Sequence, residues 1–380
     1  MADTVTWEIL RELAAFRAAK GCAVSLYLSL DPSEVPTPSD ARTRLHSLLS
    51  DAEKQLGEHR SSLAHDERLA LKGDLEHLHD WFENEFERDG ARGVVVFAAG
   101  LDNVWQSLAV ADPVTDAARI DRDLYVAPLV RLAGRPEGAL VAYVGKERAE
   151  LYRLDGTRLV EIADESGQVP GRHDQGGWSQ ARYERHIEAI VFRHLGDVAA
   201  TLDSAARGAR GVPVVLIGPE EVRTEFEGLL AHETRARVAG WTTAEAHAEP
   251  PQLLEVALPL LAEWGERMDA QLLERWREEA GKNGRAAAGW NETLEAASDG
   301  RVELLLVRDG ADRPAYRCPA CGRAQAGAGT CPLDGTTMEP SPAGLDLAVH
   351  QTLNHGGTIR VIADGSVLES AEGVAALLRF

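Results

Sequence analysis

The sequence predicts a mixed α/β protein with three domains, and three observations support this. The chain has 380 residues, more than one hydrophobic core usually organises. Short apolar runs bounded by glycine, proline or aspartate alternate with longer segments in which apolar residues recur every three or four positions. A glycine- and proline-containing stretch before Gly138 and the long helical pattern after Gln252 favour domains at 1–137, 138–268 and 269–380.

The first domain begins with a predicted helix over residues 7–19 and an apolar strand over 22–30. A Pro/Ser-rich loop follows, and two charged amphipathic helices are predicted from there to about Glu87. Two further strands are predicted at 92–100 and 103–111. Helices and strands in this order indicate an α/β domain.

The second domain opens with a meander of strands over 139–162, whose turns are "VGKE" and "LDGT". Apolar residues from Tyr183 to Leu202 are spaced by three and four, which predicts a long helix with one buried face. The predicted continuation is a strand at 212–218, a helix through 222–233 and a strand at 236–242.

A long helix from Gln252 to about Ala280 leads into the third domain. There the sequence predicts helices and strands in alternation, with a cysteine cluster between them. The predicted elements are helices at 289–298 and 345–355, strands at 302–307 and 358–364, and a closing segment at 373–380.

Charge and hydropathy exclude several classes of protein. The formal net charge is −21 and the sequence pI is about 5.0, so the chain does not coat nucleic acid with a general basic surface, and any RNA contact must be local. No stretch approaches the roughly 18 apolar residues of a membrane span. The N-terminus lacks the basic flank and cleavage site of a signal peptide. We therefore expect a cytoplasmic protein with no membrane partner.

The segment "GRHDQGGWSQARYERHIEAIVFRHL" at 171–195 joins a polar loop to a long helix. Gly176 and Gly177 free the loop backbone for conformations closed to other residues. The helix N-terminus behind them offers unpaired N–H groups and the positive end of the helix dipole. Four arginines face three acidic residues between Arg172 and Arg193, so the segment is less acidic than the chain around it. Such a corner suits a phosphate or a developing oxyanion.

This segment resembles the Gly-Gly-Gln loop of the class I peptide chain release factors of archaea and eukaryotes. Gly176 and Gly177 match the glycine pair, Ser179 matches the serine, and Arg182-Tyr183 match the arginine-aromatic pair. Trp178 occupies the position of the catalytic glutamine. The resemblance continues through "VVLIGPEEVRTEFEGLLAHE", "GWNETLEAASDGRVELLLV", "CPACG" and "QTLNHGGTIRVIADGS", and it covers roughly Gly138 to Phe380. The first third is less similar and lacks the Asn-Ile-Lys-Ser motif that reads stop codons.

The resemblance implies a fold and partners for each domain. It implies a decoding-like first domain without its decoding motif and a ribonuclease H-like second domain that presents the loop. The third domain should resemble the ribosomal proteins that bind kink-turn RNA, with a zinc-knuckle insertion at 316–336. The implied partners are the ribosome, peptidyl-tRNA and ribosomal RNA, and the family also binds a translational GTPase. The loop would enter the peptidyl-transferase centre from the A site.

The resemblance also implies roles for single residues. In the family the glutamine places water against the ester carbonyl, so catalysis depends on positioning and electrostatics. Trp178 cannot replace it, because indole offers one donor and no acceptor. The candidate catalytic residues are therefore Gly176, Gly177 and Gln180, with Gln175 next to them, and the candidate RNA-binding residues are Arg172, Trp178, Arg182 and Arg185.

Purely structural roles for these residues stay open at this point. The arginines also fit a solvated helix face, and Trp178 also fits an anchor that packs on its own domain. Three functions remain: a ribosome-rescue peptidyl-tRNA hydrolase, a non-catalytic hibernation or stress factor on the ribosome, and a cytosolic interaction module.

The cysteine cluster predicts a structural zinc site. Cys318 and Cys321 form a C-x2-C pair, and nine residues later Cys331 and Asp334 form a C-x2-D pair, each followed by a glycine. Two such knuckles would place four donors around one ion, and a carboxylate is an acceptable zinc ligand. The alternatives are a cluster that holds no metal and a fourth donor from His350 or His355.

Overall fold

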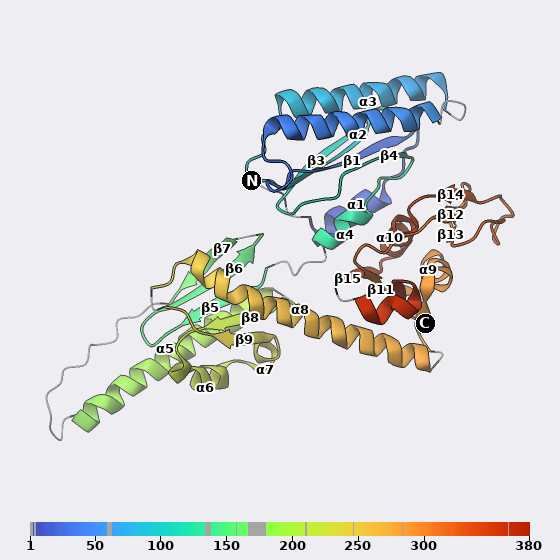
Figure 1. The fold of residues 1–380 in the computed structure, drawn as a ribbon. Helices are drawn as coiled ribbons and strands as arrows, with labels where there is room; N and C mark the ends of the chain where they lie inside the picture. The colour runs from blue at the N-terminus through green and yellow to red at the C-terminus, as the bar shows by residue number, and fades with distance from the viewer. Residues whose placement is uncertain are drawn as a thin grey trace. The chain divides into compact units, whose positions relative to one another are not determined.

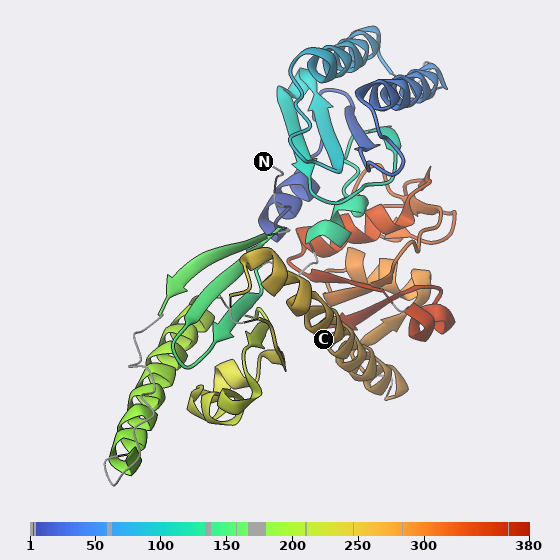
Figure 2. The same cartoon turned by 60° about the vertical axis from the view of Figure 1, so that its left-hand side comes forward.

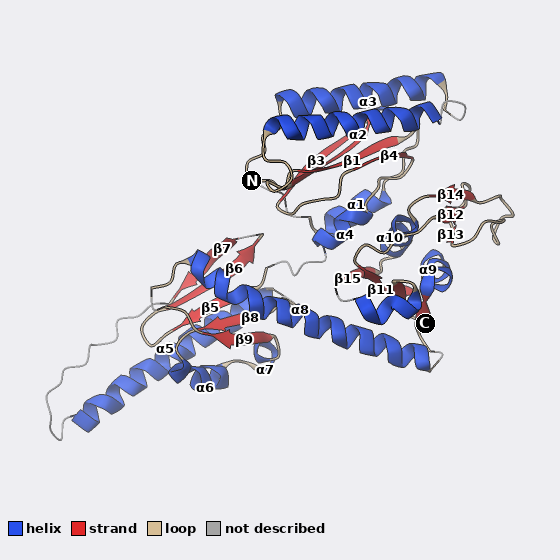
Figure 3. Ribbon diagram, in the orientation of Figure 1, coloured by secondary structure: helices blue, strands red, loops and turns tan. Residues whose placement is uncertain are grey.

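The computed structural model describes residue 3 and residues 5–58, 63–133, 138–156, 158–165, 180–209, 211–245, 247–282, 284–363 and 365–380. The chain divides into two compact units: Met1–Arg135 together with Leu272–Phe380, and Pro136–Gln271. Four sheets with helices around them confirm the mixed α/β class in these residues (Figure 3). The division into three domains stays a prediction.

The N-terminal part of the first unit is an antiparallel sheet of order β3-β2-β1-β4, covered on both faces. Its elements are α1 (Trp7–Ala15), β1 (Ala23–Ser29), α2 (Pro38–Glu58), α3 (His65–Asn84), β2 (Gly93–Ala99), η2 (Gly100–Asp102), β3 (Val104–Val110), β4 (Ala117–Asp121) and α4 (Ala127–Ala133). α2 and α3 cover one face of this sheet, and α1 and α4 lie on its other side (Figure 1). Leucines and valines of the first face pack under α2 and α3, and Tyr27 and Phe97 on the other face pack with α1 and α4. All residues of β1 and β2 are therefore buried, in agreement with a sequence that is apolar throughout β2 and apolar except for Ser25 and Ser29 in β1.

The C-terminal part of the same unit is a sheet of order β10-β16-β11-β15 between two helical layers. Its elements are β10 (Ala286–Ala288), α9 (Gly289–Ser298), β11 (Val302–Arg308), β12 (Ala315–Arg317), β13 (Ala324–Gln325), β14 (Glu339–Ser341), α10 (Gly344–Asn354), β15 (Thr358–Ile362), η3 (Gly365–Ala371) and β16 (Val374–Leu378). Leu305 and Ala376 face α9 and α10, whereas Leu306 and Leu377 face η3 and the end of α8 (Pro250–Gly281).

One hydrophobic core joins these two parts, although about 150 residues separate them in the sequence. The core under α1 and α4 continues without a break into the core of α9 and α10. α1 and α10 pack against each other. Residues 5–133 and 284–380 are thus one compact body through direct packing.

The second unit contains a five-stranded sheet of order β7-β6-β5-β8-β9. Its elements are β5 (Leu140–Val144), β6 (Ala149–Asp155), β7 (Arg158–Asp164), α5 (Gln180–Gly208), β8 (Val214–Ile217), α6 (Glu220–Leu229), α7 (His232–Arg235), β9 (Val238–Thr242) and the first part of α8. β5, β6 and β7 form an antiparallel meander, and β8 and β9 add to it in parallel. α5 and α6 cover one face and α8 covers the other (Figure 2).

Several elements differ from the predictions. The first helix ends at Ala15, and the helix predicted through 222–233 breaks into α6 and α7 because Leu230 is extended. β4, α4 and β10 were not predicted, since they are short and carry little periodicity.

Within the described residues, no helix is both long and apolar enough to cross a membrane.

Candidate functional site

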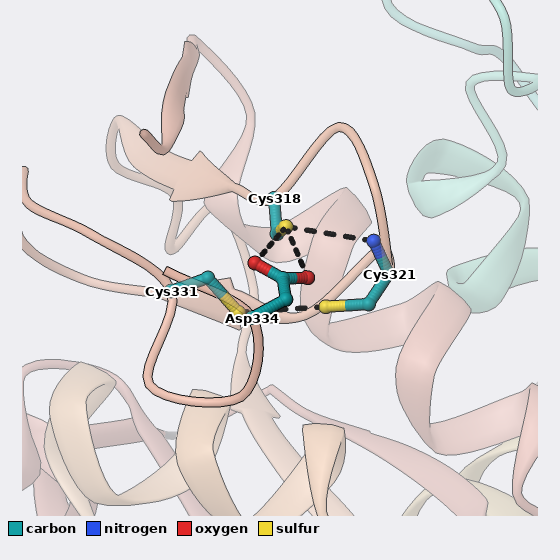
Figure 4. A group of neighbouring side chains, drawn as sticks. All are labelled: Cys318, Cys321, Cys331 and Asp334. Carbon is teal, nitrogen blue, oxygen red and sulfur yellow. Dashed lines mark hydrogen bonds between the residues drawn. The ribbon is translucent and has the colours of Figure 1, made fainter. Parts of the chain in front are cut away.

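The cysteine cluster brings four metal-binding side chains together (Figure 4). The ligand atoms of Cys318, Cys321, Cys331 and Asp334 all lie within 4.8 Å of one another. Cys321 Sγ and Cys331 Sγ are 3.5 Å apart, and Cys318 Sγ is 3.4 Å from Asp334 Oδ2. Sulfurs bound tetrahedrally to one zinc ion lie about 3.8 Å apart. The cluster can therefore hold a metal ion without rearrangement of its loops.

Two loops of equivalent geometry carry these donors. The Gly322 N–H donates to the Cys318 carbonyl, and the Gly335 N–H donates to the Cys331 carbonyl, each at 2.9 Å. The N–H of each leading cysteine donates to the carbonyl five residues later. Gly322 has φ +80° and Gly335 has φ +74°, a region that favours glycine, so the glycine after each pair is required by the turn. The two facing knuckles predicted from the sequence are present.

Crowding of acidic groups shapes the electrostatics of the cluster. Hydrogen bonds from the backbone and side chain of Thr336 hold the pKa of Asp334 well below its usual range. A hydrogen bond from the Arg323 backbone lowers the pKa of Cys321, but desolvation and the neighbouring Cys331 raise it more, to about 12. A bound cation would relieve this crowding.

The knuckles are tied to the rest of the first unit by polar contacts. Arg317 pairs with Asp123 of the N-terminal part, which Arg17 also contacts at 3.1 Å. Gln351 Nε2 on α10 donates to the Gly322 carbonyl at 2.8 Å. The order of the cluster is therefore coupled to both parts of the unit.

Neither histidine considered as a fourth donor belongs to the cluster. His350 is buried, and its ring nitrogens contact the carbonyls of Ala14 and Leu124 at 2.9 and 2.8 Å. His355 Nδ1 contacts the Gln351 carbonyl at 2.8 Å. Asp334 is the fourth donor that the geometry provides.

Most of the site residues predicted in the glycine loop lie in a part of the chain that the structure does not describe. Arg172, Gly176, Gly177 and Trp178 lie outside the described residues. Gln180 is the first residue of α5, and the side chains of Gln180 and Arg182 are not described. Arg185 is exposed on α5. The catalytic and RNA-binding assignments stay predictions.

The helix behind the loop reaches well past the core of its unit. Leu195, Val198 and Leu202 are fully buried, as the periodicity predicted. Residues 185–194 are half-buried or exposed, and Phe192 is 51% exposed. Gln180 precedes Leu195 by fifteen residues, which is about 22 Å of helix. α5 therefore extends beyond the sheet before it reaches the loop (Figure 2).

The sequence relatives of the chain are release factors. Residues 125–260 match the family model of bacterial archaeo-eukaryotic release factor family 10. The peptide chain release factor subunit 1 of Archaeoglobus fulgidus is 27% identical over 212 residues, which are 53% of this chain and 52% of that protein. The same subunit of Thermococcus kodakarensis is 30% identical over 217 residues, 54% of this chain and 52% of that protein. The chain spans about half the length of the curated relatives it matches.

Similar solved structures include two kinds of archaeal protein. The translation termination factor aRF1 has a TM-score of 0.28 and 18% identity, with 99% of each chain covered. Archaeoglobus fulgidus Pelota has a TM-score of 0.36 and 16% identity, covering 100% of this chain and 94% of that one. A model of ribosome-bound archaeal Pelota and ABCE1 has a TM-score of 0.43 and 15% identity, covering 76% and 77%.

Proposed function

Because the chain is a member of the archaeal and eukaryotic-type release factor family, we propose that it acts on the ribosome at the A site and hydrolyses the peptidyl-tRNA ester to rescue stalled ribosomes. The observation that carries this proposal is the placement of "GGWSQ" at the N-terminus of α5. Among the residues of α5 whose side chains are described, Leu195 is the first buried one, and about 22 Å of helix separates it from Gln180. This length would let the loop enter a narrow site while the sheet stays outside.

The proposed chemistry is positioning of water and stabilisation of an oxyanion. Gly176 and Gly177 would let backbone N–H groups face the ester carbonyl. The Gln180 amide would orient the attacking water in place of the family's glutamine. Arg172, Arg182 and Arg185 would contact ribosomal RNA phosphates, and Trp178 would stack on an unpaired base. A translational GTPase is a further proposed partner.

A second function is favoured by one specific residue. Trp178 stands where the family has its catalytic glutamine, and its indole has no acceptor for a water proton. The chain would then occupy the peptidyl-transferase centre and leave the ester intact, as a hibernation or stress factor.

Peptide release separates these functions. Ribosomes with labelled peptidyl-tRNA and an empty A site are incubated with the parent chain, Gln180→Ala or Gln175→Ala, and binding is measured by co-sedimentation in the same samples. We expect Gln180→Ala to bind equally and to release peptide about 100-fold more slowly, the cost of one positioned polar group. Gln271→Ala, on the exposed face of α8, is the matched control and should release like the parent.

Each other outcome has a clear meaning. Binding without release by the parent would reject hydrolysis and favour the second function. If both Gln180→Ala and Gln175→Ala release as fast as the parent, the catalytic assignment is wrong. Absence of salt-sensitive co-sedimentation would reject both ribosomal functions and leave the interaction module, which the net charge of −21 would suit.

We propose zinc as the metal of the cysteine cluster, with a structural role. Three thiolates and one carboxylate at tetrahedral spacing suit zinc, and four protein donors leave no open position for chemistry. Elemental analysis should find tightly held zinc in the parent chain and lose it in Cys321→Ser. Iron or copper in place of zinc, or equal zinc in Cys321→Ser, would contradict this assignment.

A further inference from the structure

The neighbouring helices α2 and α3 bring two histidines and a glutamate together on their outer surface. The ligand atoms of His46 on α2 and of His79 and Glu83 on α3 lie within 4.8 Å of one another. The two imidazole rings are 4.9 Å apart between centroids. His79 and Glu83 are four residues apart, so both point from the same face of α3.

The residue that precedes each of these three side chains is buried in the core. Leu45, Leu78 and Phe82 immediately precede His46, His79 and Glu83, and all three pack in the core between the helices and the sheet. The helix backbones are therefore fixed by packing, and the three ligand atoms can meet without folding of a loop. A rigid donor set of this kind needs little reorganisation to bind an ion.

The surroundings are open to solvent and include three acidic side chains. His46 and His79 line a surface hollow of about 570 Å³, together with Glu53, Glu76 and Asp80. One cation already competes for the glutamate, because Arg42 Nε lies 2.9 Å from Glu83 Oε2. The hollow thus admits ions from solution, and its carboxylates favour a cation.

We propose that His46, His79 and Glu83 bind a divalent transition-metal ion of the zinc class, at a second site distinct from the cysteine cluster. Two imidazoles and one carboxylate are a known zinc donor set that leaves the fourth position to water. Because the site lies on the two-helix layer of the N-terminal part, it is independent of the proposed ribosomal function.

Zinc titration calorimetry on the full chain, with its cysteine cluster already loaded, tests the site. We expect one further zinc ion to bind, and each of His46→Ala, His79→Ala and Glu83→Gln to weaken its binding at least about tenfold, as loss of a ligand should. Arg42→Gln should bind this zinc several-fold more tightly, since Glu83 loses its competing partner. Added cobalt should give ligand-field bands without new thiolate charge transfer, which separates this site from the cysteines.

His77→Ala is the matched control. His77 is also exposed on α3, but its ring packs on Trp105 at 4.2 Å and lies outside the cluster. If His46→Ala and His79→Ala bind zinc as tightly as His77→Ala does, the site does not exist. Weaker binding by Arg42→Gln would overturn the assignment of Glu83 as a ligand.

Discussion

Replacing Cys331 by alanine is expected to abolish metal binding at the cysteine cluster and to lower the free energy of unfolding by more than about 4 kcal/mol. The reason is that the knuckle segment has little core of its own. Its buried cluster consists of Cys318, Cys331 and Met338, with Tyr316 packed against them. Without the ion, the two loops keep their turns but lose the bond that joins them.

The measurement combines elemental analysis with denaturant unfolding and hydrogen exchange. Amide hydrogen exchange should become faster over residues 315–341 and near Asp123, whose side chain pairs with Arg317. Cys22→Ser is the control, because Cys22 is the remaining cysteine of the chain and lies far from the cluster in sequence. Equal metal content and equal stability in the two variants would refute a structural metal.

Replacing His350 by alanine is expected to lower the free energy of unfolding by about 3–5 kcal/mol at pH 6. His350 lies at the contact between the N-terminal and C-terminal parts of the first unit. Its two ring nitrogens face the carbonyls of Ala14 and Leu124, and Asp346 Oδ2 is 3.5 Å from Nε2. Two carbonyl acceptors require two N–H donors, so this geometry selects the charged imidazolium.

The pH dependence of this effect has a definite sign. Burial lowers the pKa of His350, but the Asp346 charge and the carbonyl acceptors raise it more, to about 9 from an ordinary 6.5. This contribution to stability is complete below pH 6.5 and is lost as the pH rises through about 9; it amounts to roughly 3 kcal/mol. Burial raises the pKa of nearby Asp121 and Tyr27, so Tyr27 titrates above this window.

Unfolding by denaturant from pH 6 to pH 10 checks both claims. The difference in stability between the parent and His350→Ala should be largest at pH 6 and shrink toward pH 10. His355→Ala, on the exposed end of the same helix, should change stability by less than about 0.5 kcal/mol. A penalty for His350→Ala that is constant across this range would mean that only packing is lost.

Elements with strong local patterns were predictable from the sequence. β1 and β2 are largely apolar runs, and α5 has apolar residues at helical spacing, so hydrophobic burial determines them. β4 and α4 were missed for a different reason. α4 has seven residues, and the N–H groups of Val126 and Ala127 at its start are capped by Asp346, which is 220 residues from Val126 in the chain. No local pattern can reveal such a cap.

The sequence by itself determined the cluster of three cysteines and one aspartate, because spacing within each knuckle and a glycine after each pair dictate a local turn. It also carried the resemblance to release factors, through motifs in order along the chain. Only the tertiary structure showed that one core joins residues 5–133 with 284–380, that buried His350 lies against the carbonyls of Ala14 and Leu124, and that His46 meets His79 and Glu83. Each of these depends on side chains brought together across long separations, where packing of whole elements, and not local propensity, sets the distance.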